Sequence, residues 1–372
     1  CLSSIDKCLR FREIELVKKE LQFFIDKKVP QVKFVDRTFN CRHDHAMAIW
    51  TYIHEHDNGI TNFHFEVSAD LLNEKEITLI NRMRPGLIQL EIGVQSANEI
   101  TIREINRTMK IDVLSTIVDK IKKGNNVHQH LDLIAGLPYE GYESFGKSFD
   151  RVYKMNPEQL QLGFLKVLKG SVMHDRAQEY GIVYQDRAPY EVLSTKWLTY
   201  AEVIRLKQIE EMVEVYYNSG QFCCTMSALE QEFASPFCMY ECLAAYYDEK
   251  NAFAVSHSRI GRYEILYDFI VETCKERSEQ YMEMLTLDMY LRDNVKKRPE
   301  FLRESGVSSD EAAAFYKKEE KERTYLKAYE GYDRRQMRKM THLERIDGKT
   351  VLFDYKNRDP LTGNAAIYYL SE

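Results

Sequence analysis

The chain has 372 residues, of which 44% are hydrophobic and 30% charged, and its formal net charge is -6. This is the composition of a globular protein long enough for two domains, and the charge gives no reason to expect nucleic acid as a partner. Neither an apolar run of transmembrane length nor a signal segment is present, so we expect a cytoplasmic protein that uses no membrane.

Strand-like and helix-like segments alternate from residue 11 to about residue 180. The predicted strands are 32–36, 63–67, 87–94, 127–135 and 159–167. The predicted helices are 14–24, 45–54, 73–84, 113–121, 145–155 and 172–180. This alternation predicts an α/β fold with a parallel sheet. A full eightfold barrel needs about 250 residues, so we expect a partial (β/α)6 TIM-like barrel that lacks its first strand.

The pattern changes after Gly181. Residues 182–196 are a candidate linker, and Thr199 with Glu202 fits a capping box that opens a helix. Helical patterns continue to about residue 340, and Asp347-Gly348 then predicts a hairpin. We therefore expect the partial barrel in residues 1–185 and a mainly α-helical domain with a terminal hairpin in residues 190–372.

Side chains alternate between the two faces of a strand, which sorts the residues of the predicted sheet into two groups. The apolar group, expected to pack on the helices, is Val35, Phe63, Phe65, Val67, Leu90, Ile92, Val94, Leu131 and Leu133. The opposite group is Phe34, Asp36, Thr38, His64, Glu66, Ser68, Glu91, Gly93, Gln95, His130 and Asp132. Parallel sheets with helical crossovers are rarely wet on one face. The carboxylates therefore predict a lumen that holds a ligand at the carboxyl ends of the strands.

Several of these segments resemble signatures of the radical S-adenosylmethionine (SAM) enzymes. Glu91-Ile-Gly-Val-Gln-Ser96 with Ile105-Asn-Arg107 resembles the fourth-strand signature, and Asp132-Leu-Ile-Ala-Gly-Leu-Pro138 resembles the fifth. Phe65-Glu-Val-Ser-Ala69 is similar to the third-strand segment, and Cys1-Leu-Ser-Ser-Ile-Asp6 to the sequence that follows the third cysteine of CxxxCxxC. Within the family the chain most resembles the cobalamin (B12)-binding branch, which includes proteins labelled anaerobic magnesium-protoporphyrin IX monomethyl ester cyclases and iron-sulfur oxidoreductases.

The resemblance implies a 4Fe-4S cluster, SAM and, in this branch, cobalamin. It implies that SAM is cleaved reductively to a 5'-deoxyadenosyl radical, which abstracts hydrogen from a small-molecule substrate, with electrons from a donor such as flavodoxin or ferredoxin. The residues that it assigns to SAM are Glu66, Gln95, Ser96, Arg107, Ile134 and Gly136. The residues that it assigns to the substrate or the lumen are Asp36, His64, Glu91, His130 and Asp132.

The cluster motif is where the sequence departs from the family. Cys1 would be the one surviving ligand of the 4Fe-4S cluster, and one thiolate cannot replace three. We therefore expect a chain truncated before the third cysteine of CxxxCxxC, without an assembled cluster and inactive as it stands. The intact protein would be a radical SAM oxidoreductase or transferase.

Two other functions stay open. One is a metal-dependent βα-barrel enzyme in which the lumen carboxylates and His130 hold a cation, and the other is a non-catalytic binding protein. His128 and His130 share a strand face, but a pair lacks the further ligands usual at zinc. The cysteine pairs Cys223-Cys224 and Cys238/Cys242 are interpreted as structural thiols.

Overall fold

The computed structural model describes residues 8–295 and 297–370. The chain forms two compact units: unit 1 runs to Glu214 and includes Ser235–Glu241, and unit 2 comprises Val215–Ala234 and the chain from Cys242 onward. The domain division at residues 185–190 that the sequence suggests stays a prediction. Each unit is described by itself.

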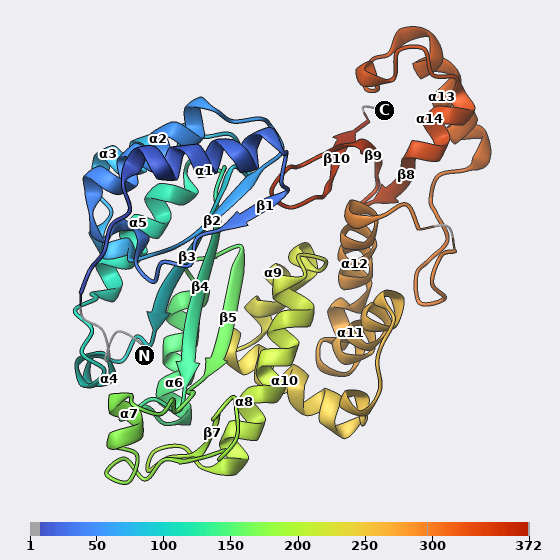
Figure 1. Ribbon diagram of the computed structural model, residues 1–372. Helices are drawn as coiled ribbons and strands as arrows, with labels where there is room; N and C mark the ends of the chain where they lie inside the picture. The colour runs from blue at the N-terminus through green and yellow to red at the C-terminus, as the bar shows by residue number, and fades with distance from the viewer. Residues whose placement is uncertain (1–7, 296, 371–372) are drawn as a thin grey trace. The chain divides into compact units, whose positions relative to one another are not determined.

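Unit 1 contains a five-stranded parallel sheet with the order β1-β2-β3-β4-β5. Its strands are β1 (Gln31–Lys33), β2 (Asn62–Val67), β3 (Ile88–Gln95), β4 (His128–Ala135) and β5 (Gln159–Phe164). Its helices are α1 (Ile14–Asp26), α2 (His43–Glu55), α3 (Glu74–Ile80), α4 (Glu99–Glu104), α5 (Ile111–Lys122), α6 (Tyr142–Tyr153), α7 (Val172–Asp175) and α8 (Tyr200–Val213). The sheet is curled like half of a barrel, and helices run along its outer side (Figure 1). The predicted α/β partial barrel is confirmed.

The helix-facing side of the sheet forms the core of unit 1. Leu90, Ile92, Leu131 and Leu133 are fully buried, as the alternation of the sequence predicts. The amphipathic helix α5 buries Leu114, Val118 and Ile121. Parallel strands need crossover connections, and in unit 1 these connections contain helices. The helices cover the apolar side of the sheet, so the polar side is the one that can form a site.

The alternation assigned to the first strand is wrong. Val35 was expected to pack on the helices, but it is 92% exposed. Phe34 packs there instead, with its ring centroid 4.5 Å from that of Phe65. The reason is the register: β1 ends at Lys33, which pairs with His64 of the polar side. Phe34, one residue later, therefore points to the helices.

The candidate linker is part of the core of unit 1. Residues 182–196 contain a short antiparallel ribbon of β6 (Val183–Tyr184) and β7 (Val192–Ser194). Ile182 and Val192 are buried in a cluster with Leu137, Leu165 and Tyr180. Capping-box hydrogen bonds between Thr199 and Glu202 then start α8, as predicted.

Unit 2 is mainly helical and ends in a three-stranded antiparallel sheet (Figure 1). Its helices are α9 (Cys223–Leu229), the end of α10 (Pro236–Glu249), α11 (Arg259–Thr273), α12 (Ser278–Arg292), α13 (Ser309–Glu322) and α14 (Arg334–Met340). Its strands are β8 (Thr341–Ile346), β9 (Lys349–Arg358) and β10 (Ala365–Tyr369). The predicted hairpin at Asp347-Gly348 joins β8 to β9, and β10 is an additional strand. No helix in the described parts of the chain is long and apolar enough to cross a membrane.

Candidate functional site

One cavity of about 1430 Å³ opens in unit 1 at the carboxyl ends of its strands. Five residues predicted for SAM or substrate line it: Asp36, Glu66, Gln95, Arg107 and Ile134. They follow or end four different strands, and Arg107 comes from the turn after α4. This is the edge at which βα folds carry their sites. The cavity is also lined by Phe11, Phe24 and Ile49, so it has both apolar and charged walls.

Asp132 of β4 organises the polar wall of this cavity. Its carboxylate accepts the backbone N–H of Val94 at 2.8 Å and the side-chain amide of Gln95 at 3.2 and 3.1 Å. The ladder between β3 and β4 shifts at this point, and Gln95 has a φ of 71°. The carboxylate therefore satisfies an N–H that the bulge releases from the ladder, and it holds the Gln95 side chain at the same time.

Arg107 lies against the same bulge. Its Nη1 donates to the carbonyl of Gly93 at 3.0 Å. A Cβ at position 93 would come within 3.2 Å of Arg107 Nη1 and 3.0 Å of Gln95 Nε2. A side chain at position 93 would push these two groups outward by a few tenths of an ångström, so glycine lets the guanidinium and the amide lie close to the strand. Gly93, Gln95, Arg107 and Asp132 form one assembly, which we call the bulge assembly.

A second polar group lies on the same side of the sheet. His64 Nε2 is 2.9 Å and Lys33 Nζ is 3.1 Å from Glu91 Oε2. The close contact with His64, with the help of Lys33, lowers the pKa of Glu91 to about 2. His130 is next to Glu91 in the ladder, and its burial lowers its pKa. We call these four residues the lumen row.

Glu66 lines the cavity and is next to Glu91 of the lumen row in the ladder. Partial burial raises its pKa, and the neighbouring carboxylates of Glu91 and Asp132 add to the shift. Removal from water likewise raises the pKa of Asp132, and Arg107 opposes that shift. Three carboxylates thus crowd one side of the sheet, and a cationic ligand beside Glu66 would relieve their repulsion.

The structure places Ser96 outside the residues that line the cavity. Its hydroxyl donates to Glu140 at 2.7 Å and accepts the backbone N–H of Asn98 at 2.9 Å. Ser148 donates to the same oxygen of Glu140 at 2.8 Å. Ser96 and Glu140 are both buried, and burial raises the pKa of Glu140. These bonds fasten the exits of β3 and β4 to α6; a contact of Ser96 with SAM stays a prediction.

Gly136 is at the exit of β4, where its φ is 88°. A Cβ there would lie 2.8 Å from Val192 Cγ1 of the β6–β7 ribbon. The absence of a side chain at this position therefore lets the ribbon approach, and a contact of Gly136 with SAM stays a prediction. Ile134, two residues earlier, lines the cavity and gives it an apolar wall, and its contact with SAM stays a prediction.

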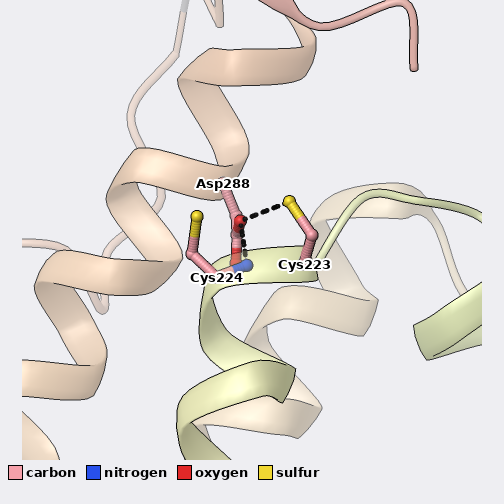
Figure 2. A group of neighbouring side chains, drawn as sticks. All are labelled: Cys223, Cys224 and Asp288. Carbon is pink, nitrogen blue, oxygen red and sulfur yellow. Dashed lines mark hydrogen bonds between the residues drawn. The ribbon is translucent and has the colours of Figure 1, made fainter. Parts of the chain in front are cut away.

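The remaining predictions concern metals. Cys1 lies outside the described residues. Over the described part of the chain, the lumen carboxylates and the imidazoles of His128 and His130 do not come together as three metal ligands. The one such group within those residues is Cys223, Cys224 and Asp288 in unit 2, which the sequence did not reveal as a site (Figure 2).

Comparison with known families agrees with this geometry. Residues 3–152 match the radical SAM superfamily. This part of the chain is a radical SAM domain. Residues 178–360 match a second family, described as Protein of unknown function (DUF4080).

Curated relatives of the chain include two oxygen-independent coproporphyrinogen III oxidases. The Salmonella typhimurium protein is 29% identical over 107 residues, and the Escherichia coli K12 protein is 28% identical over 107 residues. Each alignment covers 27% of this chain and 23% of the relative. The matched segment is thus less than a quarter of either relative.

Solved structures similar to this chain include the radical SAM methyltransferase TsrM from Kitasatospora setae with cobalamin and a [4Fe-4S] cluster bound. It is 13% identical, with a TM-score of 0.41 over 47% of this chain and 33% of TsrM. The coproporphyrinogen III oxidase HemN from Escherichia coli is 18% identical, with a TM-score of 0.34 over 43% of this chain and 40% of HemN.

Proposed function

We propose that the cavity of unit 1 binds SAM and that the lumen row faces the substrate of a radical SAM oxidoreductase or transferase. The observation that carries the proposal is that one cavity collects Glu66, Gln95, Arg107 and Ile134 from four separate segments of a radical SAM domain. Its volume of about 1430 Å³ leaves room for a nucleoside-sized ligand and a second small molecule.

The chemistry of these residues fits SAM group by group. SAM carries an ammonium, a carboxylate, a sulfonium and an adenine ring. Glu66 is the carboxylate suited to the ammonium, and Arg107 is the guanidinium suited to the carboxylate. The side-chain amide group of Gln95 already donates hydrogen bonds to Asp132, so the carbonyl oxygen of Gln95 is the atom that can accept a hydrogen bond from SAM. Ile134 supplies an apolar surface for adenine.

The residues of the chain would bind, orient and shield these ligands. With a 4Fe-4S cluster and SAM bound, reductive cleavage of SAM supplies the radical that removes a hydrogen atom from the substrate. Glu91 is held ionised by His64 and Lys33. The lumen row therefore presents fixed charge and imidazole groups to a polar substrate.

The sequence departs from the family at the ligands of the cluster. In the family these ligands are the cysteine thiolates of a CxxxCxxC motif, and this sequence contains no such motif. We propose that this chain by itself forms the SAM cavity without assembling the cluster. Three further proposals rest on the resemblance. They are that the protein uses cobalamin, that its substrate is like that of the cyclase branch, and that flavodoxin or ferredoxin is its electron donor.

The test uses the native gene product that contains this chain, reconstituted with iron and sulfide without oxygen. SAM and a reductant are added, and 5'-deoxyadenosine is measured. We expect production by the wild type, none by this chain alone, and a strong loss in Arg107→Gln. The matched control is Arg103→Gln, an exposed arginine on α4 that donates to a carbonyl of its own helix. A cluster-loaded protein that makes no 5'-deoxyadenosine, or an unaffected Arg107→Gln, would contradict the proposal.

A further inference from the structure

Two adjacent cysteines meet a buried carboxylate in unit 2, far from the cavity in sequence. Cys223 and Cys224 begin α9, and Asp288 comes from α12. Figure 2 shows the carboxylate between the two sulfurs. One sulfur atom from each cysteine and one carboxylate oxygen all lie within 4.8 Å of one another.

The donor set and its spacing suit a thiophilic divalent metal ion. Cys223 Sγ is 3.5 Å from Asp288 Oδ1. A tetrahedral zinc ion with bonds of about 2.3 Å to sulfur and about 2.0 Å to oxygen would separate the two ligand atoms by about 3.5 Å. The ion could therefore replace the thiol proton between these two atoms with little movement of either one.

The carboxylate is already held in place and lacks a cationic partner. Asp288 is 1% exposed, and it accepts the backbone N–H groups of Cys224 at 2.9 Å and Thr225 at 2.8 Å. Among the described residues, no lysine, arginine or histidine forms an ion pair with it. Buried carboxylates are normally paired with a charge or coordinate a metal. These two hydrogen bonds fix the orientation of the carboxylate, as hydrogen bonds to the ligands of a metal ion commonly do.

We propose that Cys223, Cys224 and Asp288 bind one zinc-class divalent ion, with a fourth position open to water. Binding replaces the two thiol protons by the 2+ ion and releases both protons to solvent, and no electron is transferred. Cys223 is exposed, so solvent can reach the group. This arrangement of three protein ligands and one open position is typical of a zinc ion that can take a further ligand.

The test is a titration of the full chain with Co²⁺ under reducing conditions, followed by competition with Zn²⁺. We expect one equivalent of Co²⁺ with the near-ultraviolet absorption of thiolate coordination, and its loss when Zn²⁺ is added. Cys223→Ser with Cys224→Ser should abolish this absorption. The matched control is the double variant Cys238→Ser with Cys242→Ser. It removes a different pair of thiols, spaced one helical turn apart, and it should leave the absorption unchanged.

The single substitution Cys223→Ser guards against a folding defect, because the position is exposed. It should weaken Co²⁺ binding at least tenfold with an unchanged circular dichroism spectrum. X-ray absorption of the zinc form should show two sulfur neighbours. Thiolate absorption that persists in the Cys223/Cys224 variant, or its absence from the wild type, would overturn the proposal.

Discussion

Gln95 donates its side-chain amide to both carboxylate oxygens of Asp132, at 3.2 and 3.1 Å. The bond joins the exit of β3 to β4 and leaves the Gln95 carbonyl as the group that can face a ligand. In the proposed SAM site, Asp132 would therefore act through Gln95 rather than by contact.

Asp132→Asn tests this relationship. Asparagine keeps an acceptor for the Val94 N–H, but it loses the second oxygen for Gln95 and the negative charge that attracts Arg107. We expect the Kd for SAM to rise about tenfold, the equivalent of one charge-assisted hydrogen bond. Calorimetric titration of the cluster-loaded native gene product with SAM measures this Kd. The exposed Asp119→Asn on α5 is the control, and equal affinities of the two variants would contradict the role of Asp132.

Glu66 predicts a pH dependence of SAM binding. Burial and the carboxylates of Glu91 and Asp132 raise its pKa above the ordinary 4.5. The ionised form is the one that attracts the SAM ammonium, so affinity should increase as pH rises through this raised pKa and then level off. Glu66→Gln should bind more weakly at neutral pH and lose this rise. A wild type and a Glu66→Gln variant with the same pH profile would show that another group titrates.

Glu91 should stabilise unit 1 at neutral pH. Its pKa falls from 4.5 to about 2 because His64 and Lys33 favour the ionised form. The stabilisation is therefore fully present above pH 4.5 and is lost as pH falls toward 2. Glu91→Gln should lower the free energy of unfolding by about 1–3 kcal/mol at pH 7 and by little near pH 2.

Urea unfolding followed by tryptophan fluorescence measures this effect, because Trp50 and Trp197 both belong to unit 1. The exposed Glu143→Gln on α6 is the control. A Glu91→Gln effect of the same size at both pH values would mean that packing, and not the ion pair, is responsible.

Gly136 and Gly59 form a matched pair of glycines with positive φ. Gly136 has a φ of 88°, and a Cβ there would lie 2.8 Å from Val192 Cγ1, whereas Gly59 has a φ of 73° and open space around it. Alanine at position 59 should cost about 1 kcal/mol of backbone strain. Alanine at position 136 adds a clash and should cost about 2–4 kcal/mol. Chemical unfolding measures both, and Val192→Ala should recover part of the larger loss. Equal costs at the two positions would argue against the clash.

The alternation of apolar residues was enough to predict the five strands of the parallel sheet in unit 1 and the polar side of that sheet. It failed at Phe34 and Val35 because counting continued past Lys33, where β1 ends. It also missed the β6–β7 ribbon, whose strands are two and three residues long, too short for a periodic signal.

The site was predicted only in part, for a related reason. Glu66, Gln95, Arg107 and Ile134 belong to local motifs, and the fold brings them to one cavity. The bond from Asp132 to the Val94 N–H depends on a bulge, which residue types alone do not reveal. Cys223 and Asp288 are 65 residues apart, so no spacing rule connects them.

The length of β1 has a consequence for self-association. An exposed sheet edge can recruit a strand from another molecule, and short, charged edges suppress this. β1 is only three residues long, and it carries Lys33, whose ammonium reaches across the sheet to Glu91. A strand from another molecule could pair with only a few backbone groups of β1, and it would have to desolvate the ammonium of Lys33. Within the described residues, β1 is therefore a short and charged strand at the border of the sheet, which is poorly suited to pairing with another molecule.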